Sequence, residues 1–185
     1  MKNEIRKKFK EKRRIMEKSE VLEKSRFACE VFLKSEMYKN AKTFMLYMPL
    51  GNETDTTEII KRAFADEKKL VFPVTDEKTG VITPCYATDK TKFEKGAFSV
   101  NEPCDANVAD PLDIDTVIVP GIAFDKNGGR IGFGKGCYDG FLNKTKAVKI
   151  GFCYELQLFD KIPVKEYDIK MDCIITENGI FKCNF

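Results

Sequence analysis

Residues 117–142 read VIVPGIAFDKNGGRIGFGKGCYDGFL, a stretch in which an apolar run gives way to glycines and then to aromatic residues. Val117, Ile118 and Val119 form a β-branched run that predicts a buried strand. The Pro120-Gly121 pair follows at once and ends the strand, because proline and glycine interrupt regular structure. The stretch therefore predicts a strand that leads into a glycine-rich loop.

Five glycines lie between residues 128 and 136, and two cations, Arg130 and Lys135, lie among them. Glycine lets backbone N–H groups approach an anion without a Cβ in the way. A helix expected from Tyr138 to about residue 145 would add the positive end of its dipole. We interpret the segment as a phosphate-binding loop, with Asp139 at the start of the helix as a candidate metal ligand. The alternative is a flexible glycine-rich hairpin with solvated charges.

Two known phosphate-binding signatures come close to this segment without matching it. Residues 129–135 read GRIGFGK, the GxxxxGK of a P-loop, but Gly136 stands where that loop needs a magnesium-binding Ser or Thr. Gly132 and Gly134 begin a GxGxxG, but Cys137 stands at the position of its last glycine. A Walker-type NTPase and a dinucleotide-binding fold are both disfavoured.

The chain of 185 residues contains no histidine, which excludes Ser-His and Cys-His nucleophile systems and removes the commonest transition-metal ligand. Cations, carboxylates and backbone N–H groups remain, and these are the groups that phosphoryl transfer with Mg²⁺ uses. The formal net charge of +3 is too small to indicate a nucleic-acid partner by itself.

The cysteines and the apolar runs indicate the cellular setting. Seven scattered cysteines never form a CxxC pair, so disulfide frameworks and zinc ribbons are disfavoured, and most should be reduced, semi-buried thiols. No apolar run approaches the ~20 residues of a membrane span, and the basic N-terminus lacks the apolar core of a signal peptide. We expect a cytoplasmic monomer, one domain over residues 1–185, with neither membrane nor nucleic-acid partners.

Residues 1 to about 38 have a helical pattern, with apolar residues recurring on one face and a second helix expected after a cap at Ser19. Lys2 and Arg6 are four apart, so on a helix they project to the same side and could reach one anion together. A solvated basic face is the other meaning of such charges.

Residues 43–48, TFMLYM, form an apolar run that predicts the first central strand, buried on both faces. In the loop that follows, residues 49–56, Asp55 or Thr56 can cap the next helix. Loops at the carboxyl end of a central strand are where open α/β sheets bind ligands. Glu53 is the carboxylate that we select there, although an exposed loop acid or part of the cap explains it equally well.

Further strands are expected at residues 70–74, 81–87, 148–154 and 173–176, with extended segments at 93–103 and 180–185 and a surface connection over 104–113. Strands that alternate with helical patterns predict a three-layer α/β domain with a mainly parallel sheet. Asp168 and Asp172 lie four residues apart before the strand at 173–176, where turns and caps commonly use aspartate.

The segment PGIAFDKNGGRIGFGKGCYDGFL closely resembles the signature of the 5-formyltetrahydrofolate cyclo-ligases, also called methenyltetrahydrofolate synthetases. That family usually shows a PG-x-AFD-x-x-G-x-R-x-G-x-G-x-G-x-YD run, and here Cys137 stands where it commonly has a first tyrosine. Residues 93–103 resemble its F-x-x-G-x-F-x-I-x-E-P stretch, for which spacing alone indicates no chemistry. The resemblance covers nearly the whole chain and implies an open, Rossmann-like sheet.

The resemblance also implies site residues. It matches Lys2-Asn3-Glu4-Ile5-Arg6 to an N-terminal K-x-x-x-R that contacts ATP, and Glu53-Thr54-Asp55-Thr56 to an E-x-[DE]-T whose glutamate binds the folate. It implies further ATP contacts at Arg130, Ile131, Gly132, Phe133, Gly134, Lys135, Gly136, Cys137 and Tyr138. It implies folate contacts at Met48, Glu53, Phe133, Gly134, Lys135, Gly136 and Cys137, and Mg²⁺ ligands at Asp139 and Asp168.

The activity implied by the resemblance is the ATP- and Mg²⁺-dependent conversion of 5-formyltetrahydrofolate to 5,10-methenyltetrahydrofolate, with release of ADP and phosphate. Phosphorylation of the formyl oxygen would make an imidate phosphate that N10 attacks, while Arg130 and Lys135 neutralise the transferring phosphoryl group. Two other classes stay open. A nonenzymatic nucleotide-sensing domain would not need Glu53, and a sugar-phosphate isomerase or CoA-transferase relative would not require ATP.

Overall fold

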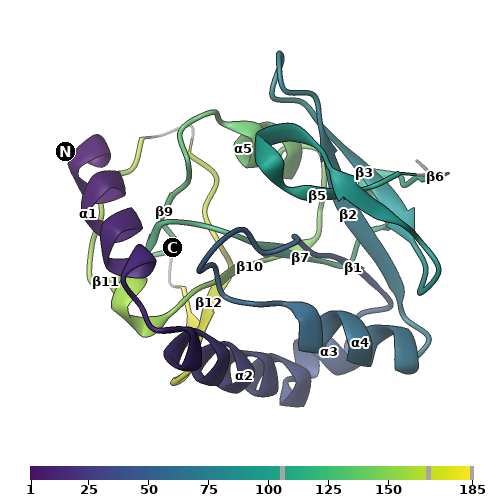
Figure 1. The fold of residues 1–185 in the computed structure, drawn as a ribbon, viewed down its shortest axis with the longest axis horizontal. Coiled ribbons are helices and arrows are strands. Elements are labelled where there is room, and N and C mark those ends of the chain that lie inside the picture. Colours follow the sequence, from purple (N-terminus) through teal and green to yellow (C-terminus); the bar gives the residue numbers. More distant parts are fainter. Residues whose placement is uncertain (105–106, 166–167, 184–185) are drawn as a thin grey trace.

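The computed structural model describes residues 1–104, 107–165 and 168–183, and an open β-sheet lies at its centre (Figure 1). Within these residues the sheet has eight strands in the order β13-β12-β10-β7-β1-β2-β3-β6. They are β1 (Thr43–Met45), β2 (Lys69–Thr75), β3 (Ile82–Ala87), β6 (Asn107–Val108), β7 (Thr116–Val119), β10 (Val148–Phe152), β12 (Cys173–Thr176) and β13 (Gly179–Lys182). The five strands from β12 to β2 run parallel to one another. At the edges, β13 pairs antiparallel with β12, β3 with β2, and β6 with β3. The sheet is therefore open and mainly parallel, as the sequence predicts.

Helices cover both faces of this sheet. They are α1 (Lys2–Arg14), α2 (Lys18–Lys34), α3 (Glu36–Asn40), α4 (Thr57–Ala65) and α5 (Cys137–Leu142). In Figure 1, α2, α3 and α4 lie along one face and α5 lies on the opposite face. Helix α1 lies at one end of the sheet, beside the short strands β9 (Arg130–Ile131) and β11 (Leu158–Phe159). This arrangement confirms the three-layer α/β prediction.

Neighbouring side chains of the central strands pack into two different cores. Phe44 of β1 packs with Phe32 of α2 and Ile59 of α4, whereas the next residue, Met45, packs on the other face with Phe141 of α5. All three residues of β1 are buried. Parallel strands covered by helices on both faces require such continuous apolar runs. The interpretation of residues 43–48 as a central strand is confirmed, although regular pairing ends at Met45.

The start of α2 differs from the expected one. The predicted cap at Ser19 is wrong, because the chain turns from an extended Glu17 and the helix has already begun at Lys18. For α4 the prediction was a cap by Asp55 or Thr56. Thr56 stands at the N-cap position without a side-chain cap bond, and Oδ1 of Asp55 accepts a hydrogen bond of 2.8 Å from the N–H of Thr57, the first residue of α4.

Helix α5 is shorter than expected. It begins at Cys137 and ends at Leu142 rather than near Thr145. The N–H of Lys144 bonds to the carbonyl of Phe141 at 2.8 Å, so the chain closes a tighter three-residue turn and leaves the helix.

The first half of the glycine-rich stretch is a β-hairpin. β8 (Ala123–Asp125) pairs antiparallel with β9 (Arg130–Ile131), and β11 (Leu158–Phe159) pairs with β8 as a third strand. The Asp125 carboxylate closes the turn by accepting hydrogen bonds from the N–H groups of Asn127 at 3.0 Å and Gly129 at 2.8 Å. The N–H groups of Asn127 and Gly129 are therefore already bonded to Asp125. The expected phosphate-binding loop begins later than predicted, at Gly132.

Two smaller expectations are corrected at the sheet edge. The surface connection over 104–113 contributes the edge strand β6, which pairs with β3. Residues 93–103 form a separate hairpin of β4 (Phe93–Lys95) and β5 (Asn101–Pro103) around a 3₁₀ turn. The strand expected at 180–185 is present as β13, and residues 184–185 lie outside the described residues.

All seven cysteines are thiols rather than disulfides, and Cys29, Cys85, Cys153 and Cys173 are fully buried. Within the ranges that the structure describes, every helix falls short of the length and apolar character that a bilayer crossing demands.

Candidate active site

The candidate site lies where the strand order of the sheet reverses. From the adjacent pair β1 and β7, the chain adds β2 on one side and β10 and β12 on the other. Open α/β sheets bind ligands outside the carboxyl ends of the strands at such a point. The loop after β1 carries Glu53, and the segment after β7 begins with Pro120 and Gly121. The topology therefore brings two segments singled out in the sequence to one edge.

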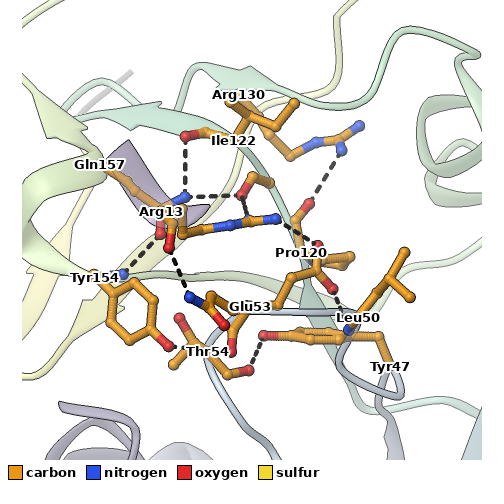
Figure 2. Close-up of polar contacts among 12 residues, drawn as sticks. Arg13, Tyr47, Leu50, Glu53, Thr54, Pro120, Ile122, Arg130, Tyr154 and Gln157 are labelled. Carbon is orange, nitrogen blue, oxygen red and sulfur yellow. Dashed lines mark hydrogen bonds and ion pairs between the residues drawn. The ribbon is translucent and has the colours of Figure 1, made fainter. Parts of the chain in front are cut away.

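Glu53 is buried at this edge, with 5% of its surface exposed, so the exposed-acid alternative is wrong. Its Oε2 accepts a hydrogen bond of 3.1 Å from the N–H of Leu50, and its Oε1 lies 3.5 Å from Nη2 of Arg13 (Figure 2). Tyr154 donates its hydroxyl to the backbone carbonyl of Glu53 at 3.1 Å, and Tyr47 donates to that of Thr54 at 2.6 Å. The loop is held from both sides before any ligand binds.

The pKa values of Glu53 and of two tyrosines of the site are linked. Burial raises the pKa of Glu53, and the nearby Arg13 guanidinium only partly offsets this. Burial is also the main cause that raises the pKa of Tyr47 and of Tyr138, and the Glu53 carboxylate raises both further. Tyr138, the first residue after Cys137 in α5, is therefore close enough to interact with the carboxylate from the loop after β1.

The glycine-rich segment from Gly132 to Gly136 is the part that remains open. Gly134 and Gly136 have φ angles of +109° and +69°, which other residues rarely adopt. Phe133 is 47% exposed, and its ring centroid lies 6.0 Å from Cζ of Arg13. Lys135 is exposed, with its Nζ 4.0 Å from the ring centroid of Phe98.

Helix α1 lies against this segment with its N-terminal half. Arg6 donates from Nε to the carbonyl of Gly132 at 2.9 Å and from Nη1 to Asn3 at 2.6 Å. Lys2 forms an ion pair with Asp168, and Ile5 packs against Ile131 and its neighbours. The structure thus brings the sequence-predicted set at residues 2–6 to the predicted loop. Glu4 is the exception, because its exposed carboxylate pairs with the N-terminal amine at 2.8 Å.

Arg130 is buried beside the first of the two candidate metal ligands. Its Nη2 donates to Oδ2 of Asp139 at 3.0 Å. Its Nη1 donates to the carbonyl of Pro120 at 3.3 Å (Figure 2). Its Nε is buried and, among the described residues, has no hydrogen-bond partner. A buried donor without a partner costs free energy, so the Arg130 guanidinium has an N–H group that an anion could accept from.

The backbone next to Asp168 reaches the Asp139 side chain. The N–H of Ile169, the residue after Asp168, lies 3.4 Å from Oδ1 of Asp139. Burial alone would raise the pKa of Asp168, but hydrogen bonds from Lys2 and from the backbone N–H of Lys165 outweigh it and lower the pKa.

These two carboxylates fit Mg²⁺ in number and kind. The described ranges contain no group of three or more His, Cys, Asp or Glu side chains arranged to share a metal ion. Mg²⁺ does not require such a cage, because proteins commonly hold it through one or two carboxylates together with phosphate oxygens and water. Each carboxylate is now paired with a cation, Arg130 or Lys2, which a bound phosphate would attract in its place.

The remaining predicted residues lie around this centre. Met48 is half-buried and packs against the core on the α2–α4 face. A Cβ on Gly80 would lie 3.3 Å from the Cys137 thiol, so the turn between β2 and β3 covers this residue. Tyr138 lies under the Arg130 guanidinium at 5.7 Å.

The sequence analysis missed Arg13, Tyr154 and Gln157. Gln157 donates from Nε2 to the carbonyls of Gly121 and Ile122, at 3.0 and 2.9 Å, and so supports the segment after β7 (Figure 2). Arg13 was hidden in a basic run, although one signal could have found it. At ~100° per residue, positions 2, 6 and 13 of a helix fall within about 40° of each other, so Arg13 shares a face with Lys2 and Arg6.

Comparisons with known proteins agree with this geometry. The model of the 5-formyltetrahydrofolate cyclo-ligase family matches residues 1–177. The 5-formyltetrahydrofolate cyclo-ligase of Mus musculus is 25% identical over 95% of this chain and 93% of its own. That of Mycoplasma genitalium is 33% identical over 72% of each chain.

Solved structures give the same result. An Aquifex aeolicus 5,10-methenyltetrahydrofolate synthetase matches all of this chain and 93% of its own, with a TM-score of 0.88 and 32% identity. A Mycoplasma pneumoniae 5,10-methenyltetrahydrofolate synthetase, at 24% identity and a TM-score of 0.75, shares the fold. Since the family model covers residues 1–177, a range that contains the residues gathered at this site, the chain belongs to the 5-formyltetrahydrofolate cyclo-ligase family.

Proposed function

We propose that this protein cyclises 5-formyltetrahydrofolate to 5,10-methenyltetrahydrofolate, consuming ATP in the presence of Mg²⁺ and releasing ADP and phosphate. The formyl oxygen attacks the γ-phosphorus, an O–P bond forms, and the bond to ADP breaks. N10 then attacks the formyl carbon and loses its proton to solvent. The C–O bond of the resulting imidate phosphate breaks, phosphate leaves, and the methenyl bridge remains.

The folate end of the proposed site is built on Glu53. A pterin ring offers N–H donors along one edge, and a carboxylate can accept two of them in charge-assisted bonds. The bonds from Leu50 and Arg13 leave further acceptor capacity on the Glu53 oxygens, since an ionised carboxylate has about four lone-pair sites. Such a contact would orient the N5-formyl group toward the phosphate segment. Met48, Phe133 and Cys137 complete the folate contacts that we propose.

The phosphate end is built on cations and glycines. Lys2 and Arg6 on α1 would hold ATP, together with the segment from Arg130 to Tyr138. Lys135 and Arg130 would neutralise the charge that spreads over the transferring phosphoryl group, which is the main catalytic task in phosphoryl transfer. Lys135 is exposed, with its Nζ over the Phe98 ring, so its side chain can move to a phosphate.

Asp139 and Asp168 would hold Mg²⁺, which would supply positive charge to offset the negative charge of the phosphates. The chain's own task there is to exchange partners. Arg130 and Lys2 now neutralise the two carboxylates, and a nucleotide phosphate would draw both cations away from them.

One observation carries the proposal: the guanidinium of Arg13 contacts both the loop after β1, which carries Glu53, and the segment after β7, which leads to the phosphate segment. Its Nη2 lies 3.5 Å from Glu53, and its Nη1 lies 3.4 Å from the carbonyl of Gly121 (Figure 2). A nucleotide-sensing domain would have no use for a buried carboxylate next to its phosphate segment. An isomerase relative would not need the cations of α1 and the glycine segment together.

The decisive experiment mixes the protein with 5-formyltetrahydrofolate and MgATP and follows the methenyl chromophore and ADP. We expect both in equal amounts. ATP binding without methenyl product would favour a sensing domain, and product formation indifferent to ATP would favour the isomerase relative.

A variant separates the folate end from the phosphate end. Glu53→Gln should weaken use of 5-formyltetrahydrofolate while MgATP binding stays nearly intact. Glu58→Gln is the matched control, because Glu58 is exposed on α4 and forms an ion pair with Lys61 at 2.9 Å. Equal loss of ATP binding and folate turnover in Glu53→Gln would show that Glu53 supports the fold or the nucleotide site instead.

A further inference from the structure

Arg13 is a buried cation whose side chain does not belong to any motif of the sequence. Only 9% of its surface is exposed. Its guanidinium reaches Oε1 of Glu53 and the carbonyl of Gly121, at 3.5 and 3.4 Å (Figure 2). Asn52 fastens the same end of α1 to the loop, because its Nδ2 donates to the backbone carbonyls of Arg13 at 2.9 Å and Met16 at 3.2 Å. Two neighbouring residues of the loop after β1, Asn52 and Glu53, therefore bind the C-terminal end of one helix.

A buried carboxylate needs a compensating charge to remain an anion. Burial raises the pKa of Glu53, and Arg13 is the cation that opposes this. The other titratable groups that face Glu53 are tyrosines: Tyr47 after β1, Tyr138 in α5 and Tyr154 after β10. Burial raises the pKa of all three, to about 12 for Tyr154, so they stay neutral near pH 7. Removal of Arg13 would leave Glu53 among neutral groups.

The helix that carries Arg13 also carries the cations of the phosphate segment. Arg13 lies 11 positions after Lys2, which is about 17 Å along a helix. Arg6 bonds to Gly132, and Phe9 packs edge-on against Phe159 at 4.7 Å between ring centroids. Both ends of α1 are therefore anchored, one at the phosphate segment and one at Glu53.

We propose that Arg13 is the positioning residue of Glu53, which it fixes at the ligand-binding edge of the sheet in the orientation that folate recognition needs. The proposal rests on the proposed function. Arg13 acts through Glu53 and has no contact with the reacting atoms. A protonated or rotated Glu53 would lose the charge-assisted bonds to the pterin edge, so folate binding suffers while nucleotide binding does not.

The test compares Arg13→Gln and Arg13→Lys with Arg14→Gln. Arg14 is the matched control, because it is the next residue of α1 and its exposed side chain pairs with Glu11 at 2.7 Å. Arg13→Gln should raise KM for 5-formyltetrahydrofolate by roughly tenfold or more, with KM for MgATP changed less than about twofold. Arg13→Lys should restore part of the loss because it keeps the charge, and Arg14→Gln should behave as wild type.

The pH dependence gives a readout that a merely structural role would not move. In Arg13→Gln, Glu53 should lose its proton at higher pH than in the wild type, so KM for the folate should fall as the pH rises from about 6 to 8. The wild type and Arg14→Gln should show no such change. A flat profile in Arg13→Gln would overturn the proposal.

A double variant isolates the pair. In a Glu53→Gln background, Arg13→Gln should add little to the folate KM, because the group that Arg13 positions is already gone. Additive losses, or an unchanged folate KM in the single Arg13→Gln variant, would overturn the proposal. If Arg13→Gln does not fold, Arg13→Lys with and without Glu53→Gln provides the same comparison. Absence of methenyl product from the wild type would instead refute the proposed function, which keeps the two failures distinct.

Discussion

The guanidinium of Arg130 donates to Oδ2 of Asp139 at 3.0 Å, and the glycine-rich segment lies between the two residues in the chain. The arginine side chain is 6% exposed and that of the aspartate is 29% exposed, so the pair joins a buried cation to a carboxylate at the surface of the site. Nε of Arg130 is left without a partner among the described residues. The ion pair thus places the candidate metal ligand, Asp139, next to a candidate phosphate-binding group, Arg130.

Replacing Asp139 by Asn should change the metal requirement more than the fold. An amide is a neutral and weaker ligand for a hard cation, so the Mg²⁺ concentration for half-maximal rate should rise. Asparagine keeps an oxygen that can accept the hydrogen bond from Arg130, so the unfolding free energy should fall by only about 1–3 kcal/mol. Magnesium titrations of the rate, with thermal melts in parallel, measure both effects.

Asp172→Asn is the control for that experiment. Asp172 accepts a hydrogen bond of 2.7 Å from the N–H of Lys149 and so supports β10, away from the pair of Asp139 and Asp168. It should lower the melting temperature and leave the Mg²⁺ requirement unchanged. If Asp139→Asn did the same, Asp139 would be a structural partner of Arg130 and not a metal ligand.

Lys135→Ala should lower kcat by about 10²-fold or more, because it removes a charge whose importance grows as the phosphoryl group transfers. Stability should hardly change, since the side chain is exposed and lies over the Phe98 ring. Steady-state kinetics with saturating MgATP give the answer. Lys144→Ala, an exposed lysine just beyond α5, is the control, and equal kinetics for the two variants would remove Lys135 from the mechanism.

Gly134→Ala should weaken MgATP binding. At a φ of +109° an alanine is strained by about 1–3 kcal/mol, and its Cβ would lie 3.4 Å from Cζ of Arg6. The segment would relax by moving away from Arg6 and from its own conformation. Calorimetric titration with MgATP measures the loss of affinity.

Gly140→Ala provides the comparison for Gly134→Ala. A Cβ at Gly140 meets no atom within 4 Å, and alanine should slightly stabilise the helix α5. Gly134→Ala should therefore lower the stability and the ATP affinity. Gly140→Ala should slightly raise the stability and change the ATP affinity less. Indistinguishable behaviour would mean that the conformation at Gly134 has no bearing on the nucleotide.

The pKa of Glu53 predicts how stability depends on pH. Burial raises it above the ordinary value of 4.5, so the folded protein holds this proton more tightly than the unfolded chain does. Its contribution to stability is full below pH 4.5 and is lost as the pH rises through the folded pKa. Urea denaturation at several pH values should show Glu53→Gln gaining stability relative to wild type as the pH rises.

Asp168→Asn should show the opposite trend. The pKa of Asp168 is lowered from 3.8, so its contribution is present above that value and is lost as the pH falls through the folded pKa. The wild type should therefore lose stability relative to Asp168→Asn on acidification. Parallel curves for the two variants would contradict both assignments.

Local sequence patterns were sufficient for the layers of the fold. The apolar runs at 43–48 and 117–119 predicted buried central strands because only a strand covered on both faces needs such continuity. The glycines at 132, 134 and 136 marked the open segment correctly, since two of them have positive φ. The preceding glycines were misassigned, because the local turn in which the Asp125 carboxylate binds the N–H groups of Asn127 and Gly129 was not recognised.

By itself, the sequence determined the α/β class, the capping of α4 by Asp55 or Thr56 and the position of the glycine segment, because each depends on residues close together in the chain. Tertiary structure alone decided the burial of Glu53 and its pairing with Arg13, 40 residues away. That pair depends on the C-terminal end of α1 reaching the loop after β1 and the segment after β7. The spacing of charges on a helix face is the same whether that face meets water or a buried carboxylate. The physical reason is that burial and the partner of a charge are set by contacts between distant segments, which periodicity does not encode.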